Sequence, residues 1–282
     1  MRRMRVIVRA LFGATLVAGG MATLAATAQA ITIPVACSEN ALVAAVNLAN
    51  TTSAADTLVL AGGCTYNLTS AHGGLTDGLP VITTPIEMIG PATITRTSLL
   101  PFRIAEVSST GSLTLTTSVA LTNGSAVGDG GAILNHGAVT LTNSSLTGNT
   151  ATLNGGGLAN ADTPSGTAPA ATFTRSPVAD NSALLNGGGI YNGTRGTLTT
   201  TGVSGSPLFI TGNTSAQGGG IAAVNSTATT LTQTAINTNH ALLTAGGVYR
   251  QGGTMTTTNT PITANTPNNC VGSVPAVPNC TG

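Results

Sequence analysis

The sequence predicts an all-β protein, a parallel β-solenoid in which one chain coils through successive turns. Three observations carry this prediction: a repeat of 26 residues, short strand signals with two-residue alternation inside each repeat, and Gly–Gly pairs between them. No repeat holds an apolar run of 3.6-residue period, which excludes units that alternate a strand with a helix. A unit this small cannot bury its own inner face, whereas stacked units share one continuous core.

The first 30 residues have the composition of a secretory signal peptide. Four arginines precede an apolar run, Ala10 to Val17, and small residues lead to Ala28-Gln29-Ala30, an A-x-A-type cleavage site. No later segment approaches the roughly 20 continuous apolar residues of a transmembrane helix. We therefore expect a chain that is exported as residues 31–282, is secreted or held at the cell surface, and has no transmembrane segment.

The exported part is poor in charge. It holds five arginines, no lysine and eight acidic residues, which makes its net charge −3, and charged residues are 6% of the whole chain. Five scattered arginines cannot form the basic face that phosphate contacts need, so we expect no nucleic-acid partner. Solubility must therefore rest on Thr, Ser and Asn.

Four cysteines in an exported chain indicate two disulfides. Of the three possible pairings we expect Cys37–Cys64 and Cys270–Cys280, because each joins cysteines that are close in sequence. A zinc site is the alternative, but the chain has no C-x-x-C motif and none of its three histidines stands at ligand spacing. We expect neither a metal nor a cofactor.

Residues 31–95 predict an N-terminal cap followed by a first irregular coil. Ser38 to Asn50 reads as a short helix with Ser38 as N-cap and one apolar face. This helix is placed to cover the end of the first coil, which would otherwise expose core and strand edges. A strand from Thr57 to Leu60 follows, and Pro80 to Ile94 forms the irregular coil.

Residues 96–267 contain the repeats, in which an aliphatic or small residue is followed three positions later by asparagine. Asparagine tolerates the left-handed backbone of a corner, and its amide can bond the same side chain in the next coil. We therefore expect these asparagines to form a structural ladder. Its expected members are Asn123, Asn149, Asn181, Asn213, Asn239 and Asn265. Gly–Gly pairs mark a second corner, where the chain bends or approaches itself too closely for a Cβ atom.

A short Thr-x-Thr strand precedes each asparagine. Its central residue points inward, so we expect both threonines to point outward and to form two columns along the solenoid. The expected first column is Thr114, Thr140, Thr172, Thr197, Thr230 and Thr256. The expected second column is Thr116, Thr142, Thr174, Thr199, Thr232 and Thr258. Such a hydroxyl array can bind glycans, or order water and bind ice; the alternative is that threonine merely suits an exposed β surface.

The repeated motifs GGAI, GGGL and GGGI resemble the right-handed parallel β-helix repeats of polymorphic outer membrane proteins. The opening C…ALVAAVNLAN…ADTLVLAGGCTYNL is similar to the N-terminal cap of secreted bacterial β-helix proteins. The tail NTPNNCVGSVPAVPNC, residues 265–280, is similar to the tails of such proteins in actinomycetes. Residues 268–282 are expected to form a disulfide-bonded C-terminal tail that loops over the far end.

This resemblance implies a single-stranded right-handed parallel β-helix of the pectate-lyase-like type. The chain departs from the family in two ways. The family's Phe-x-x-Asn has an aliphatic residue or alanine in place of phenylalanine, and the autotransporter barrel that ends in an aromatic residue is missing. The resemblance therefore implies the fold and not the anchoring mechanism.

Polysaccharide lyases and glycoside hydrolases share this fold, so catalysis is the alternative function. Their sites need several carboxylates in matching register on neighbouring coils. Asp129, Asp162 and Asp180 occupy three different registers, and Arg175 with Asp180 indicates only a surface ion pair. A cluster among the acids of the cap and early coils stays open. These acids are Glu39, Asp56, Asp77, Glu87 and Glu106.

The sequence as a whole favours a secreted or cell-surface β-helix protein with a non-enzymatic adhesive, binding or structural role. No catalytic residue is assigned. Glycans or other cell-envelope components are the expected partners. The insertions at residues 161–170 and 201–207 are expected to form variable loops, because solenoid insertions often gather on a binding face.

Overall fold

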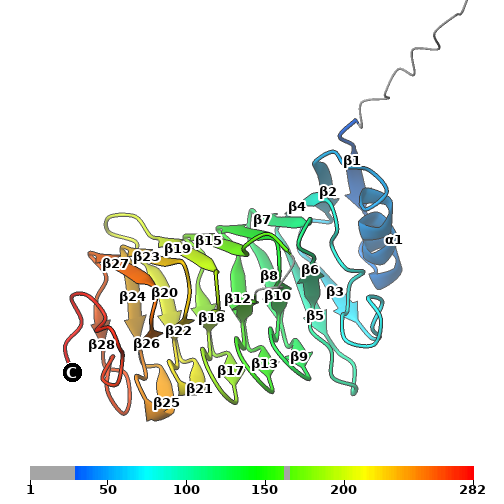
Figure 1. Ribbon diagram of the computed structural model, residues 1–282. Helices are drawn as coiled ribbons and strands as arrows, with labels where there is room; N and C mark the ends of the chain where they lie inside the picture. Colours follow the sequence, from blue (N-terminus) through cyan, green and yellow to red (C-terminus); the bar gives the residue numbers. More distant parts are fainter. Residues whose placement is uncertain (1–28, 162–165) are drawn as a thin grey trace, which may run out of the picture.

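The computed structural model describes residues 29–161 and 166–282. The expected signal peptide lies outside these residues except for its last two positions. The described chain forms 28 β-strands and one α-helix and winds into a parallel β-helix of about eight turns (Figure 1). The parallel β-solenoid predicted from the repeat is thereby confirmed, and it is consistent with the right-handed β-helix that the resemblance implies.

The strands stack into four sheets, and neighbours in each sheet come from successive turns. The nine-stranded sheet contains β1 (Thr32–Val35), β2 (Asp56–Leu60), β4 (Pro85–Ile89), β7 (Ser112–Thr116), β11 (Ala138–Thr142), β15 (Ala170–Thr174), β19 (Thr197–Thr201), β23 (Ala228–Thr232) and β27 (Thr254–Thr258). The eight-stranded sheet contains β3 (Cys64–Leu68), β5 (Ala92–Arg96), β8 (Val119–Thr122), β12 (Ser145–Thr147), β16 (Val178–Ala179), β20 (Leu208–Thr211), β24 (Thr234–Asn237) and β28 (Ile262–Thr263).

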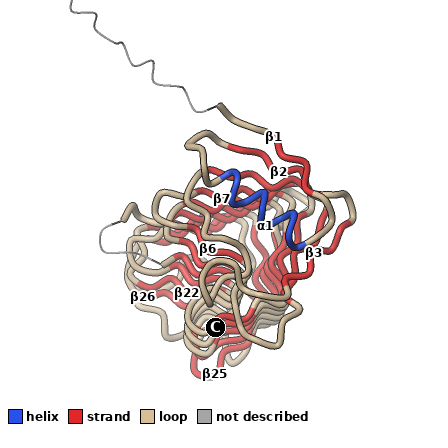
Figure 2. The backbone as a smooth tube through the Cα atoms, turned by 90° about the vertical axis from the view of Figure 1, so that its right-hand side faces the viewer, coloured by secondary structure: helices blue, strands red, loops and turns tan. Residues whose placement is uncertain are grey.

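Two further sheets close the cross-section. The five-stranded sheet contains β9 (Ser125–Ala126), β13 (Thr150–Ala151), β17 (Ser182–Ala183), β21 (Thr214–Gln217) and β25 (His240–Thr244). The six-stranded sheet contains β6 (Ala105–Val107), β10 (Ile133–Asn135), β14 (Leu158–Asn160), β18 (Ile190–Asn192), β22 (Ile221–Val224) and β26 (Val248–Gln251). Viewed along the axis the turns superpose, with β1, β2 and β7 on the upper side and β25 at the lower end (Figure 2).

The core is a set of stacked apolar columns inside the coil. In the nine-stranded sheet Leu115 pairs with Leu141, and Leu141 with Phe173, and all three side chains are fully buried. Alternation of side chains along each strand produces this arrangement, since every second residue points inward. Thr200 interrupts the column, and its buried hydroxyl is satisfied by the Thr234 hydroxyl at 2.8 Å.

The N-terminal turn is covered by α1 (Glu39–Ala49), as the sequence predicts. The Ser38 hydroxyl oxygen accepts the N–H of Ala41 at 3.2 Å, which caps the first turn of the helix. Leu42, Ala45, Val46 and Ala49 are buried against the first turn. Residues 80–94, which were predicted to form the first irregular turn of the solenoid, supply β4 and most of β5, and these strands pair in register with later turns.

Both predicted disulfides, Cys37–Cys64 and Cys270–Cys280, are present. The first ties the start of the cap to β3. The second closes the C-terminal tail, which lies over the last turn: the Val274 N–H donates to the Arg250 carbonyl at 2.8 Å. The tail therefore covers main-chain groups of β26 that would otherwise be an open edge.

Candidate functional site: a threonine face and two corner cavities

The nine-stranded sheet presents two columns of threonine side chains to solvent. Parallel pairing holds them in register across β7, β11, β15, β19, β23 and β27. The first column is Thr114, Thr140, Thr172, Thr199, Thr230 and Thr256. The second column is Thr116, Thr142, Thr174, Thr201, Thr232 and Thr258. We refer to these twelve residues as the threonine face.

The predicted positions of Thr197 and Thr199 in the two columns are wrong. In β19, Thr199 pairs with Thr172 and Thr201 pairs with Thr174, so Thr197 is level with the alanine that begins β15. The strand reads TLTTT, and two Thr-x-Thr patterns fit within it. Only the pairing between turns selects the second of these patterns.

The hydroxyls of the threonine face are available to a ligand. Thr116 is the one member of the face with a hydroxyl bonded to another described residue, since it donates to Glu87 Oε1 at 3.2 Å. Glu87 bounds the face at its N-terminal edge, where β4 places it level with Thr114. No ionisable or aromatic residue is among the twelve, and the Phe173 ring of β15 points into the core.

The threonine face is a regular and pre-formed array. Main-chain hydrogen bonds join each strand to the turns before and after it, apart from the terminal strand β27. Neighbouring turns of such a sheet lie roughly 4.8 Å apart, and alternate residues of one strand roughly 6.6 Å apart. The hydroxyls therefore stand on a fixed two-dimensional grid.

Two cavities lie at the corner beside the second threonine column. The first corner cavity, of about 360 Å³, is lined by Asn143, Arg175 and neighbouring residues. The second corner cavity, of about 310 Å³, lies between the loop of residues 202–207 and the corner residues Gln233 and Asn259. Asn143, Arg175, Gln233 and Asn259 each directly follow a threonine of the second column, so both cavities adjoin the threonine face.

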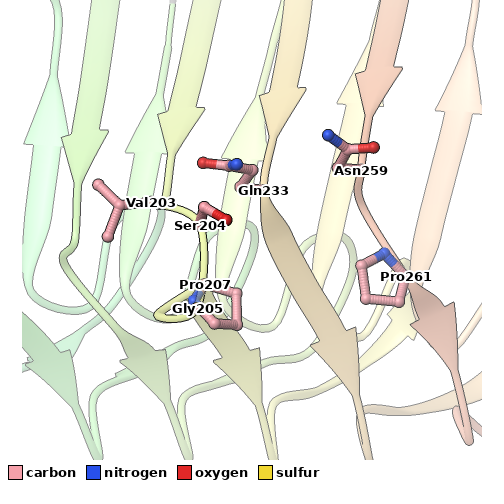
Figure 3. A pocket seen from close by; sticks show the side chains of 7 residues that line it. All are labelled: Val203, Ser204, Gly205, Pro207, Gln233, Asn259 and Pro261. Atoms are coloured by element: carbon pink, nitrogen blue, oxygen red, sulfur yellow. The ribbon is translucent and has the colours of Figure 1, made fainter.

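The second corner cavity is neutral. The polar ends of Gln233, Asn259 and Ser204 lie around it, and Pro207 and Pro261 supply apolar surface (Figure 3). Neither side-chain amide is engaged in a hydrogen bond with another described residue. An amide offers both donors and an acceptor, which suits a ligand rich in hydroxyl groups.

Arg175 does not pair with Asp180, contrary to the sequence-based expectation. Its Nε donates to Asn143 Oδ1 at 2.8 Å, and the ion pairs within the described residues do not include it. Arg175 follows β15 whereas Asp180 follows β16, so a strand of the eight-stranded sheet separates the two side chains at different corners.

Five buried asparagines form a ladder at the corner between the eight-stranded and five-stranded sheets, and the partly buried Asn269 of the C-terminal tail ends it. The Nδ2-to-Oδ1 distances are 2.9 Å for Asn149–Asn181, 3.0 Å for Asn181–Asn213, 2.9 Å for Asn213–Asn239, 3.0 Å for Asn239–Asn265 and 3.0 Å for Asn265–Asn269. Each Oδ1 in these pairs also accepts the main-chain N–H of the preceding asparagine. The ladder is thus structural, because its polar atoms are used up inside the corner.

Asn123 does not belong to the ladder. Its expected place is taken by Gly124, whose N–H donates to Asn149 Oδ1 at 2.9 Å. Asn123 is exposed, and its Nδ2 donates instead to Thr95 Oγ1 at 3.0 Å. Gly124 precedes Asn149 by 25 residues, one fewer than the usual spacing of 26. Asn123 therefore lies one residue outside the corner.

The left-handed backbone of this corner falls on the residue before each ladder asparagine, not on the asparagine itself. These residues are Gly148, Asp180, Gly212, Thr238 and Ala264, with φ between 53° and 67°. The expectation that asparagine serves the corner by adopting this backbone is therefore wrong for the five ladder asparagines, although Asn123, with φ of 58°, does adopt it. The role of those five is the side-chain ladder.

A second asparagine ladder, missed by the sequence analysis, runs inside the corner after the six-stranded sheet. Asn135 Nδ2 donates to Asn160 Oδ1 at 2.7 Å, and Asn160 Nδ2 to Asn192 Oδ1 at 2.9 Å. All three side chains are fully buried. The signal was present in the sequence, because each asparagine follows a glycine-rich motif in GGAILN, GGGLAN and GGGIYN.

Two of the early acids meet at a buried arginine. Arg103 Nη1 lies 2.5 Å from Asp77 Oδ1 and 3.4 Å from Glu106 Oε2, and its Nε donates to the Asp129 carbonyl at 3.3 Å. Asp77 and Arg103 are almost completely buried. Burial and the Asp77 carboxylate raise the pKa of Glu106, against the opposing effects of Arg103 and His136. We refer to Asp77, Arg103 and Glu106 as the arginine cluster.

The remaining early acids hold the cap together. Glu39 Oε1 accepts the N–H of Thr69 at 2.9 Å and of Ser70 at 3.2 Å, and contacts His72 Nε2 at 2.9 Å. Burial alone would raise the pKa of Glu39, but the hydrogen bonds from Thr69, His72 and Ser70 lower it below its usual 4.5. Asp56 Oδ1 accepts the N–H of Ile31 at 2.8 Å.

Within the described residues, no group of three or more His, Cys, Asp or Glu side chains is placed to hold a metal ion. In the same part of the chain, no helix combines the length and the apolar character needed to cross a membrane.

Neither a model of a known protein family nor a curated protein matches this sequence.

Proposed function

We propose that this protein is a non-enzymatic β-helix protein of the cell exterior that binds neutral glycans through the threonine face. The observation that carries the proposal is the double column of threonine hydroxyls, in register over six turns and almost wholly without intramolecular partners. A repeating polymer with hydroxyl groups on every unit is the ligand that such a repeating array suits.

The chemistry of the face favours an uncharged ligand. A hydroxyl both donates and accepts hydrogen bonds, as sugar hydroxyls do, and no charge on the face attracts an ionic polymer. The amides of Gln233 and Asn259 add donors and acceptors at one edge. Because the main-chain ladder holds the array rigid, binding requires little further ordering of the protein.

The cellular setting is part of the proposal. Two disulfides are typical of chains that fold in an oxidising compartment. The leader-like residues 1–30 and the resemblance to repeats of polymorphic outer membrane proteins point the same way. We therefore assign the protein to the secreted or surface-held class, with cell-envelope glycans as its partners.

The test is a glycan and cell-wall polysaccharide array probed with residues 31–282. The variant Thr142→Lys/Thr174→Lys places two long charged side chains in the second column, and we expect it to lose binding. Thr122→Lys/Thr147→Lys is the matched control, because Thr122 and Thr147 are paired, partly exposed strand residues of the neighbouring sheet. No binding to any glycan, or equal binding by both variants, would mean that these threonines only suit an exposed β surface.

One observation favours a second candidate, hydrolysis of a glycan. The arginine cluster places two carboxyl groups on one guanidinium nitrogen, and the raised pKa of Glu106 is what a general acid requires. Asp77 would be the second carboxylate. This candidate predicts release of reducing sugar from a polymer by the parent protein and none by Glu106→Gln; release that survives this change would reject the cluster as its source.

A further inference from the structure

A ridge of exposed aliphatic side chains runs along the five-stranded sheet, on residues that follow β9, β13 and β17 and on two residues within β25. Its members are Val127, Leu153, Leu184, Leu185, Leu242 and Leu243, which are 43–70% exposed. They come from four turns, and an intervening turn places the smaller Ala216 at the same level. We refer to these six residues as the aliphatic ridge. Neither the core nor the proposed glycan site uses it.

The ridge is in register for the same reason as the threonine face. Ala126, Ala151 and Ala183 pair with one another inside the corner, which places Val127 and Leu184 level with Thr152, and Leu153 level with Leu185. Thr152 therefore interrupts the aliphatic side chains in one turn of the ridge. The main chain there is already hydrogen-bonded: the Leu185 N–H donates to the Leu153 carbonyl at 2.8 Å. Removing the ridge from water would therefore bury its side chains and leave these main-chain N–H and C=O groups hydrogen-bonded.

The ridge projects from the molecule. The strands β9, β13, β17, β21 and β25 line the lower edge of the solenoid in Figure 1, and β25 forms the lower end of the cross-section in Figure 2. The threonine face belongs to the sheet along the upper edge in both views. The two surfaces thus lie on opposite sides of the coil.

The flanks of the ridge are polar and mostly uncharged. Ser125, Thr150, Ser182 and Thr214 begin the strands on one side. Asn154 and Asn186 lie on the other side, joined by a 2.9 Å hydrogen bond between their side chains. The ionisable groups on these flanks stand at its two ends: Asp129, which accepts from Asn154 Nδ2 at 2.8 Å, and His240, which contacts Thr266.

We propose that the aliphatic ridge inserts into the interfacial layer of a lipid surface made of electrically neutral lipids. A narrow projecting ridge is poorly shaped for the broad, well-packed patch of a stable protein interface, whereas lipid chains close around it. Hydroxyl and amide flanks suit the headgroup layer. A chain without lysine, and with no arginine in the ridge, has little attraction for an anionic membrane, so apolar burial must supply the affinity.

Insertion of the ridge would hold the protein at a lipid surface without any contact to a glycan. A protein held by the ridge would present the threonine face away from the lipid, because the two lie on opposite sides of the coil. The surface contact is peripheral, made by side chains of the folded solenoid.

Flotation with phosphatidylcholine vesicles at physiological salt tests the proposal. Residues 31–282 contain every described strand and the helix, and are used for all proteins. We expect the parent to float, and Leu184→Ser/Leu185→Ser/Leu242→Ser/Leu243→Ser to bind at least about tenfold more weakly. Leu75→Ser/Leu99→Ser/Leu100→Ser is the matched control, since these leucines are at least as exposed but lie outside the ridge; it should float like the parent. Equal thermal melting of all three proteins shows that each is folded.

Three outcomes would overturn the proposal: a folded parent that does not float, a ridge variant that floats like the parent, or flotation only with phosphatidylserine vesicles that salt abolishes. The proposal would also be overturned if sedimentation velocity showed the parent as a dimer and the ridge variant as a monomer, because the ridge would then join two copies of the chain. Glycan array binding is scored separately, so loss of one activity does not decide the other.

Discussion

Asn181 Nδ2 donates to Asn213 Oδ1 at 3.0 Å across the step from one turn to the next, and the same oxygen accepts the Asn181 N–H at 3.0 Å. Asn213 Nδ2 in turn donates to the Val178 carbonyl at 3.0 Å and to Asn239 Oδ1 at 2.9 Å. Every polar atom of this buried side chain is therefore satisfied by a neighbouring turn. The ladder binds the turns together as a connected network rather than as isolated pairs.

Asn213→Ala should lower the free energy of unfolding by about 3 kcal/mol, because it leaves buried donors and a carbonyl without partners. Denaturation in guanidinium chloride measures the change. Asn67→Ala is the control: Asn67 is an exposed residue of β3 outside the ladder, and its loss should cost at most about 0.5 kcal/mol. If the two variants had equal free energies of unfolding, the hydrogen bonds of the ladder would not stabilise the fold.

Arg103→Met should destabilise the fold by about 3–5 kcal/mol, because it leaves the buried Asp77 carboxylate without its partner. The double change Arg103→Met/Asp77→Asn should recover much of this loss, since no unpaired buried charge remains. Arg175→Met, at an exposed arginine, should cost within about 1 kcal/mol. A single variant as stable as the double would refute the assignment of a stabilising ion pair.

Glu39 should make the cap sensitive to acid. Its pKa in the folded protein is below the usual 4.5, so its ionised form stabilises the fold above pH 4.5. That contribution is lost as the pH falls through the folded-state pKa. In unfolding measured against pH, the difference between the parent and Glu39→Gln should be largest near neutral pH and should shrink on acidification; a constant difference would contradict the lowered pKa.

Glu106 should show the opposite behaviour. Its pKa is raised in the folded state, so the folded protein binds this proton more tightly than the unfolded chain does. Stability is therefore lost as the pH rises from 4.5 through the raised pKa. Relative to the parent, Glu106→Gln should be more stable at neutral pH than it is at pH 4, and the same relative stability at both would show that the pKa is not raised.

The Cys37–Cys64 disulfide should contribute more than the Cys270–Cys280 disulfide. Their sequence separations are 27 and 10 residues, and loop-closure entropy then corresponds to about 3.5 and about 2.7 kcal/mol. Replacing each pair with alanine and measuring unfolding under oxidising conditions checks the order. A larger loss from the C-terminal pair would show that covering the last turn matters more than the constraint on the unfolded chain.

Sequence periodicity predicted the fold because each turn repeats the same short strands, asparagines and glycine pairs. The cap helix was predictable from Ser38 and the apolar face behind it, and both disulfides from their spacing. Register was harder to predict. Thr197 and Asn123 were misplaced because shifts of two residues and one residue leave an equally plausible pattern, and only strand pairing between turns resolves the choice.

The sequence by itself determined the parallel β-helix, its capping helix, its disulfides and the existence of outward threonine columns, since all of these follow from periodic or local signals. Tertiary structure alone decided which acids meet at Arg103, where cavities open beside the threonine face, and that six aliphatic residues align on the opposite edge. The physical reason is that these features depend on contacts between side chains at corners and inserted loops, which the repeat spacing does not specify. They arise only when turns of unequal length are stacked and their side chains brought level.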